Sequence, residues 1–195
     1  KATPNDDLLP LGGNMHCSTE FAEELRDVAS LGDMTSRSLE LVRRSLGVSL
    51  VNAVVFPATG EDILHIDLWS NEMAPDFLVK TGLAALARID EELGTAAELS
   101  ARGKCCFDVE PMFASLGIDT RRTVTHNEFW PASKVERQAL AYLGPPGRPI
   151  GFLCAARKQA HRAFTPHELG TVAAVRDAME HALQELAPRP LEAAG

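Results

Sequence analysis

The 195-residue sequence lacks the signals of several common protein classes. It has no run of 18 or more apolar residues, and its first residues lack the basic-then-apolar order of a signal peptide. Its four cysteines, at positions 17, 105, 106 and 154, have neither the spacing of a disulfide scaffold nor that of a zinc site. These absences favour a cytoplasmic protein with reduced thiols, without a membrane partner and without a bound metal.

Enzyme motifs are also missing. The sequence contains no Gly-x-Ser-x-Gly, no phosphate-binding Gly-rich loop, no His-Glu-x-x-His and no paired Cys-x-x-Cys. We therefore predict no catalytic residues and no enzyme activity. The remaining composition is that of a globular domain, with 45% hydrophobic and 24% charged residues.

Positive charge is scarce in the first part of the chain. The net charge is −8, and residues 1–120 carry 9 Lys/Arg against 20 Asp/Glu, whereas residues 121–195 carry 10 against 7. Nucleic-acid-binding domains present a stripe of Lys and Arg, which is absent here. We therefore predict that this domain makes no nucleic-acid contact itself.

The clearest structural pattern lies between residues 136 and 186. Two apolar runs, Gln138–Leu143 and Ile150–Ala156, flank the turn-forming residues Gly144–Pro149, which predicts an antiparallel hairpin. Thr165 can then cap a helix, with Pro166 at its first position and Glu168 completing a capping box. Apolar residues continue at helical spacing to Leu186, so a long C-terminal helix is expected.

This order of strand, turn, strand entered through Pro-Ile-Gly-Phe-Leu, and helix opened by Ala-Phe-Thr-Pro-His-Glu-Leu resembles the C-terminal half of a GAF domain. The variant it resembles most is the sensory domain ahead of the DNA-binding module in some bacterial LuxR-type regulators. The resemblance covers about residues 33–187. It implies an α+β fold with a central antiparallel sheet flanked by helices, and a small-molecule pocket. The Asn-Lys-x-Asp-Glu signature of cyclic-nucleotide-binding members is absent.

The N-terminal half has the element order that this resemblance implies. Helices are predicted over 18–31, with Gly32 as a C-terminal cap, and from Asp33 to Leu46. A strand buried on both faces follows over 48–56, then a turn over 57–60. Residues 61–69 alternate, and we interpret His65 and Asp67 as the solvent face of a half-exposed strand.

The helices near the two ends of the chain are the predicted contact between two copies of the protein. In GAF domains such helices pack together on one sheet face and commonly form a homodimer, which implies a homodimer through residues 18–46 and 165–186 here. A purely intramolecular role is an equally open alternative, because amphipathicity does not name its partner. Domain boundaries are expected at 1–17 for a leader, 18–187 for one GAF-like domain and 188–195 for a linker or truncated end.

The middle of the chain predicts the ligand site. Helical patterns run over 75–93 and over 109–116. Between them, a capping box at Thr95–Glu98 opens a further short helix. In GAF folds the segment corresponding to 102–130 covers the sheet and walls the pocket. Its aromatic, thiol and basic residues are the ligand-binding candidates, and they are Cys105, Cys106, Phe107, Arg121, Arg122, His126, Phe129 and Trp130.

Each candidate also has a plainer interpretation. The adjacent thiols could form a redox sensor with a pKa lowered by Lys104, or could be two small buried hydrophobes. The arginine pair with His126 could bind an anion, or could lie on the surface. Phe129 and Trp130 could stack on a ligand or fill the core.

The resemblance thus implies a cytoplasmic ligand sensor that controls an attached DNA-binding output domain through the geometry of a dimer. The ligand is a small molecule of unknown identity, and any cofactor is unknown. Two alternatives stay open: a thiol-dependent reductase similar to the GAF-type enzymes that reduce free methionine sulfoxide, and a structural dimerisation module with no ligand.

Overall fold

A computed structural model of the chain describes residues 15–56, 64–71, 80, 95–102, 106–123, 126–127, 135–158 and 162–186. The helices are α1 (Met15–Glu24), α2 (Leu31–Ser45), α4 (Ala96–Arg102), α5 (Val109–Ser115), the 3-10 turn η1 (Thr120–Arg122) and α7 (Pro166–Leu186). The strands are β1 (Leu50–Val55), β2 (His65–Ser70), β3 (Cys106–Asp108), β4 (Arg137–Leu143) and β5 (Gly151–Arg157). Within these ranges, no helix has the length and apolarity needed to cross a membrane.

The five strands form one antiparallel sheet in the order β2-β1-β5-β4-β3, as predicted for the fold class. Among the described strands, the pairs β1–β2, β3–β4 and β4–β5 join strands that are consecutive in the sequence, whereas β1–β5 joins distant ones. The sheet centre is the pairing of β1 with β5, in which Asn52 lies opposite Cys154. Both central strands are almost entirely buried, in agreement with their apolar sequences.

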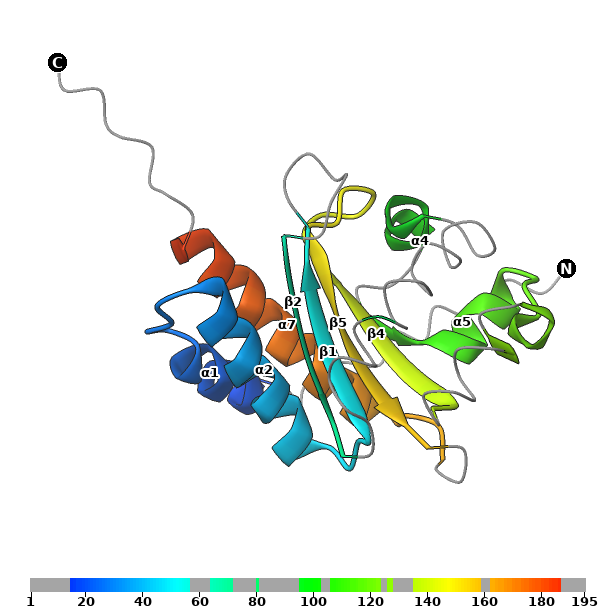
Figure 1. The fold of residues 1–195 in the computed structure, drawn as a ribbon, viewed down its shortest axis with the longest axis horizontal. Coiled ribbons are helices and arrows are strands. Elements are labelled where there is room, and N and C mark those ends of the chain that lie inside the picture. The colour runs from blue at the N-terminus through cyan, green and yellow to red at the C-terminus, as the bar shows by residue number, and fades with distance from the viewer. Residues whose placement is uncertain are drawn as a thin grey trace, which may run out of the picture.

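Helices α1, α2 and α7 form a layer on one side of this sheet, and α4 and α5 lie on the other side (Figure 1). The long helices near the two ends of the chain are therefore packed together on one sheet face, as predicted. Their apolar stripes meet alternate residues of the strands in the main core. Its fully buried side chains include Met34, Val42, Val51, Leu153, Val172, Val175 and Met179.

The predicted helix boundaries near residue 30 are wrong. Helix α1 ends at Glu24 rather than at Leu31, and α2 begins at Leu31, so Gly32 is not a C-terminal cap. The N-cap of α2 is Ser30, whose Oγ accepts from Asp33 N at 3.1 Å, while Asp33 Oδ2 accepts from Ala29 N at 3.0 Å. Asp33 thus occupies the third helical position, where a carboxylate completes the cap instead of starting it.

The two predicted capping boxes are confirmed. In α4, Glu98 N donates to Thr95 Oγ1 at 3.3 Å, and Glu98 Oε2 accepts from Thr95 N at 2.9 Å. In α7, the same pair of bonds joins Glu168 and Thr165 at 3.3 and 2.8 Å. The two boxes differ in their surroundings, because Glu168 is also paired with buried Arg157.

Strand β2 is half-exposed, as predicted, but its polar face does not point into solvent. His65, Asp67 and Trp69 face α2, where Thr35 Oγ1 lies 3.0 Å from His65 Nε2 and 3.4 Å from Asp67 Oδ2. Thr35 is completely buried. The predicted alternation of β2 is therefore confirmed, but the prediction that His65 and Asp67 face solvent is wrong. Helix α2 covers these polar side chains, and they find hydrogen-bond partners there.

Several predicted features lie outside the described residues. These are residues 1–14 of the leader predicted over 1–17, the turn over 57–60, the helix over 75–93 apart from Lys80, and the end of the chain after 186. Helix α1 begins at Met15, three residues before the predicted start at 18. The short helix predicted over 109–116 is confirmed as α5.

Candidate functional site

The sheet face that points away from α1, α2 and α7 is the candidate site. Successive side chains of a strand point to opposite faces, so Val54 and Asn52 of β1 share this face with Phe152 and Cys154 of β5. Further along the sheet, Leu140 and Tyr142 of β4 and Phe107 of β3 continue it. The face is therefore mostly apolar and rich in aromatic rings, with Asn52 of β1, Ser70 of β2 and Gln138 of β4 as its polar strand residues.

The aromatic rings form two pairs. The ring centroids of Phe56 and Phe152 are 6.0 Å apart, and those of Phe107 and Tyr142 are 6.1 Å apart, both in tilted arrangements. Such tilted geometries are favourable for aromatic pairs. The pairs lie at the β1–β5 and β3–β4 sides of the face respectively.

Helices α4 and α5 cover the β3–β4 side of this face. Leu99 of α4 and Phe113 of α5 are 2% and 3% exposed and belong to one apolar cluster with Phe107, Tyr142 and Phe152. A second, smaller cluster on the same face contains Leu50, Val135 and Ala156, with Leu68 packed against it. On β1, Asn52 lies between Val54, which belongs to the larger cluster, and Leu50, which belongs to the smaller one.

The thiol on this face is chemically inert. Burial raises the pKa of Cys154 to about 12, so the thiolate, which is the reactive form, is not populated at neutral pH. Cys154 therefore contributes a small apolar contact to the face.

The adjacent candidates Cys106 and Phe107 lie on opposite faces of the sheet. Cys106 joins the core beneath α1, α2 and α7, whereas Phe107 belongs to the cluster beneath α4 and α5. This follows from strand alternation, because both residues lie in β3. Cys105, Phe129 and Trp130 lie outside the described residues.

Arg121 and Arg122 lie in η1 with exposed side chains, 73% and 87% accessible. Each has a carboxylate close by: Arg121 Nη2 is 3.5 Å from Glu110 Oε1, and Arg122 Nε is 3.4 Å from Asp119 Oδ2. An open depression of about 420 Å³ next to them is lined by both carboxylates. An anion there would meet negative charge as well as Arg121, so the geometry does not favour anion binding.

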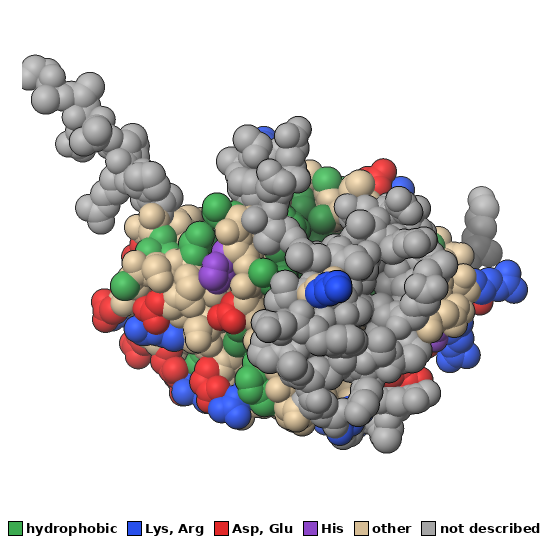
Figure 2. Space-filling model, in the orientation of Figure 1, with side chains coloured by type: hydrophobic (Ala, Val, Ile, Leu, Met, Phe, Trp, Pro, Cys, Tyr) green, Lys and Arg blue, Asp and Glu red, His purple; other side chains and the backbone are tan. Residues whose placement is uncertain are grey.

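His126 is half-buried, and its backbone N–H donates to Thr123 Oγ1 at 3.1 Å. It follows η1 in the chain. Among the described residues, no group of three or more His, Cys, Asp or Glu side chains is placed to hold a metal ion. Figure 2 shows that charged side chains gather instead over the region of α1 and α2, at the lower left of this view.

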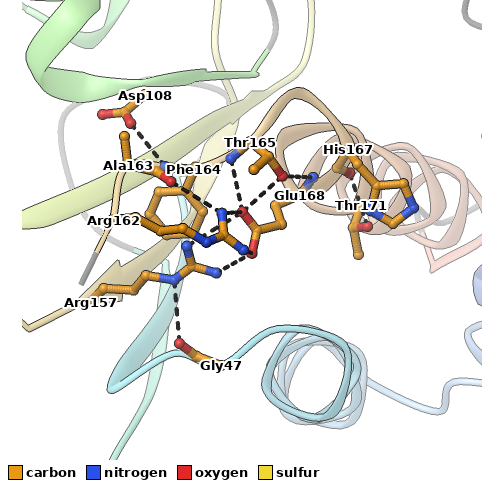
Figure 3. A network of polar contacts seen from close by, with 10 residues as sticks. All are labelled: Gly47, Asp108, Arg157, Arg162, Ala163, Phe164, Thr165, His167, Glu168 and Thr171. Carbon is orange, nitrogen blue, oxygen red and sulfur yellow. Dashed lines mark hydrogen bonds and ion pairs between the residues drawn. The ribbon is translucent and has the colours of Figure 1, made fainter.

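A cluster of polar side chains lies on the sheet side covered by α1, α2 and α7, where α7 begins (Figure 3). Arg157 of β5 and Glu168 of α7 form an ion pair at 2.5 Å with side chains only 5% and 12% exposed. The Arg157 guanidinium carbon also lies 4.2 Å from the ring centroid of Phe164, and its Nε donates to Gly47 O at 3.3 Å. Arg162 donates to Glu168 from the solvent side at 2.8 Å.

The surroundings of this cluster shift two carboxyl pKa values in opposite directions. Burial alone would raise the pKa of Glu168, but hydrogen bonds from Arg157, Thr165 N and Arg162 outweigh it and hold the pKa well below its usual range. Burial raises the pKa of Asp108, and the Phe164 N–H bonded to its Oδ2 at 3.3 Å only partly opposes that rise. The cluster therefore fastens β3, β5 and the loop before β1 to the start of α7.

The turn between β4 and β5 is held from both sides of the sheet. Gly147 N donates to Ser100 Oγ of α4 at 3.0 Å, and Gly144 N donates to Glu180 Oε1 of α7 at 2.5 Å. Both glycines have positive φ, +77° and +91°, which only glycine adopts without strain. This turn connects the helix above the candidate face to the long helix below it.

Sequence reasoning missed Asn52, Ser100 and the Arg157–Glu168 pair. Asn52 had a visible signal, since it is the one polar residue in the run Val-Asn-Ala-Val-Val-Phe at 51–56. Ser100 bonds to Gly147, 47 residues away, and Arg157 and Glu168 are 11 residues apart. No local sequence pattern indicates such pairings.

Comparisons with known proteins support the fold. No family model and no curated protein matches the chain. The solved structures that resemble it include GAF3 from Slr1393 of Synechocystis sp. PCC6803, with a TM-score of 0.57 and 14% identity over 80% of this chain and 94% of that one. Escherichia coli SdiA, a LuxR-type regulator, has a TM-score of 0.57 and 16% identity over 87% and 67%.

The chromophore-binding domain of Stigmatella aurantiaca phytochrome P1 gives a TM-score of 0.57 and 15% identity, over 97% of this chain and 64% of that one. At these identities the likeness concerns the fold. The chain has a GAF-like fold, as the resemblance seen in the sequence implied.

Proposed function

We propose that this GAF-like domain is the sensory part of a bacterial transcription regulator. It binds a small molecule on the sheet face beneath α4 and α5, and it controls an attached DNA-binding domain through the geometry of a homodimer. The observation that carries the proposal is the largely apolar, aromatic sheet face, on which the polar side chain of Asn52 lies in a central strand. Small-molecule sites have this composition of apolar walls and few polar groups.

Two neighbours support a ligand role. One solved SdiA structure is a complex with octanoyl-rac-glycerol, and it has a TM-score of 0.58 and 14% identity to this chain over 95% of its length. The phytochrome neighbour is named for chromophore binding. Proteins with this fold thus bind chemically different molecules, so the fold supports a ligand without naming it.

The same geometry favours sensing over thiol chemistry. The Cys154 thiol is held protonated by burial, and Cys106 is buried on the other side of the sheet. A thiol reductase needs an accessible thiolate. Neither of these two cysteines has that environment.

The proposal predicts that the purified chain retains a ligand. In a native mass spectrum we expect a dimer with added mass that disappears in the denatured spectrum. Leu140→Trp, which adds an indole on the candidate face, should remove the added mass. Leu169→Trp places the same substitution on α7, at another half-buried leucine, and should retain it.

A bare polypeptide mass for the native dimer, in chain purified from its own cells as well as from a foreign host, contradicts the proposal. A monomer carrying the ligand contradicts only the dimer part of it. Loss of the added mass in both tryptophan variants shows general unfolding instead of a site, and circular dichroism of each variant detects that case.

In this proposal, the turn between β4 and β5 transmits the effect of ligand binding from α4 to α7. Ser100 is 7% exposed, and its Oγ donates to Ala97 O at 3.1 Å while it accepts from Gly147 N. Glu180, which accepts from Gly144 N, is also bound by Arg176 at 2.9 Å. A displacement of α4 therefore moves the turn, and the turn pulls on the C-terminal half of α7.

We expect Ser100→Ala to speed amide hydrogen exchange at Gly147 by about 5-fold, the effect of losing one net hydrogen bond. If the turn acts as one unit, exchange at Gly144 rises as well. Ser115→Ala is the matched control, since Ser115 Oγ makes the same kind of bond, to Met112 O at 2.6 Å, without touching the turn. Faster exchange at Gly147 with no change at Gly144 contradicts the transmission route.

A further inference from the structure

The carboxamide of Asn52 lies on a central strand of the largely apolar sheet face. Asn52 is in β1, one of the two central strands, with Leu68 opposite it on β2 and Cys154 opposite it on β5. Its neighbours on the same face of β1 are Leu50 and Val54. These four neighbours are uncharged and offer no strong hydrogen-bonding group to the amide.

The amide oxygen of Asn52 is buried and has no hydrogen-bond partner among the described residues. The amide nitrogen is not among the buried unpaired atoms, and the side chain as a whole is half-buried. The residue is therefore only partly buried, whereas its amide oxygen is fully buried and meets no donor from the described residues. A buried acceptor without a donor destabilises a fold, and such groups are rare in native structures.

The position of this oxygen coincides with a break in the apolar packing. Val54 and Cys154 belong to the larger cluster beneath α4 and α5, whereas Leu50 and Ala156 belong to the smaller one. The two clusters are separate, and Asn52 stands between their β1 members. A leucine or valine at this position, as at its neighbours, would continue the packing across the strand.

We propose that Asn52 is the residue that selects the ligand, by accepting a hydrogen bond from an N–H or O–H group on it. The inference rests on the ligand-binding function proposed above. The ligand class is a neutral, mostly apolar molecule with a hydrogen-bond donor. Its apolar parts contact the two clusters on either side of Asn52. A charged ligand is disfavoured, because the immediate neighbours of Asn52 provide no opposite charge for it.

The ligand-free chain provides the first test. Asn52→Leu removes the unpaired acceptor and joins the two clusters, so we expect the melting temperature to rise by about 2–6 °C. Asn52→Val serves as a second variant in case leucine is too large for the site, since valine is smaller and favours strands. Asn71→Leu, at an exposed asparagine just after β2, is the control and should leave the melting temperature unchanged. A lower melting temperature for both Asn52 variants overturns the inference, because it shows that the amide is satisfied in the empty fold.

The second test uses two probes of nearly equal shape, 4-propylphenol and its methyl ether 4-propylanisole, with affinities measured by ligand-detected NMR. We expect the native chain to bind the phenol at least about 10-fold more tightly than the ether, since only the phenol donates a hydrogen bond. Asn52→Leu should bind both with affinities within about 2-fold of each other. Asn71→Leu should keep the preference for the phenol.

The outcomes separate this inference from the proposed function. Equal binding of both probes by the native chain overturns the role of Asn52 and leaves the ligand-binding face intact. A preference for the phenol that survives in both Asn52 variants overturns it as well, because another group then accepts the bond. Absence of binding for both probes up to their solubility limits, together with a bare native mass spectrum, overturns the inference and the proposed function together.

Discussion

Replacing Glu168 with glutamine is expected to lower the free energy of unfolding by about 3–5 kcal/mol, the range for breaking one partner of a buried ion pair. Glutamine keeps the shape of glutamate and can still accept the Thr165 N–H at the start of α7. It cannot neutralise Arg157, whose side chain is only 5% exposed. The cost therefore comes from a buried guanidinium left without its carboxylate.

The matched control is Glu98→Gln in α4. Glu98 makes the same capping-box bonds, to Thr95, but it is exposed and has no buried arginine as partner. We expect the urea unfolding midpoint of this variant to stay close to that of the native chain. A similar loss in both variants would assign the effect of Glu168 to the cap instead of the ion pair.

The pH dependence gives an independent check on the same pair. Because the pKa of Glu168 is lowered in the folded chain, its contribution is fully present above the pKa of an unfolded glutamate, about 4.3, and disappears as the pH falls below it. The difference in stability between the native chain and Glu168→Gln should therefore be constant near neutral pH and shrink in acid. A difference that stays the same down to pH 3 would contradict the assignment.

Gly151→Ala is expected to have the second large effect, a loss of about 3 kcal/mol, at the upper end of the range for overpacked sites. A Cβ added at Gly151 would lie 2.2 Å from Val54 O and 3.0 Å from Leu143 Cδ1. The closest atom belongs to the backbone of the neighbouring strand, so no side chain can rotate away to make room. The β1–β5 pairing at the centre of the sheet must separate instead.

Gly47→Ala is the control for this prediction. No atom lies within 4 Å of a Cβ built at Gly47, and its carbonyl oxygen stays available to Arg157. Unfolding in urea should give a midpoint for Gly47→Ala equal to that of the native chain or slightly higher, because alanine restricts the unfolded state more than glycine does. A Gly151→Ala variant as stable as Gly47→Ala would show that β1 and β5 are not held at the spacing described here.

The parts of the fold that the sequence predicted are those set by local chemistry. The hairpin of β4 and β5, the cap at Thr165 and the length of α7 each follow from residues within one turn or one strand of each other. The same is true of the Thr95 capping box. The sequence also predicted Asp33 as the N-cap of α2, whereas the N-cap is Ser30. This error is local too, since Ser and Asp both cap helices well and only the chain direction at residue 30 decides between them.

The parts that could not be predicted depend on contacts between distant segments. His65 and Asp67 alternate with apolar residues as a solvent-facing strand does, and only the position of α2 shows that Thr35 covers them. Cys106 and Phe107 are neighbours in the sequence, yet the register of β3 sends them to opposite sides of the sheet. The candidate site is affected most, because it is assembled from four strands.

The strand order also has a consequence for how the chain folds during its synthesis. The central pair, β1 with β5, joins residues about 100 positions apart, which a ribosome translates in about 5–20 s at the usual rates. During that interval β1 has at most its neighbour β2 to pair with, and its side chains apart from Asn52 are apolar. A nascent strand of this kind is prone to associate with other chains. Slower synthesis of the segment between the two strands should therefore lower the soluble yield, and binding of a chaperone to β1 should restore it.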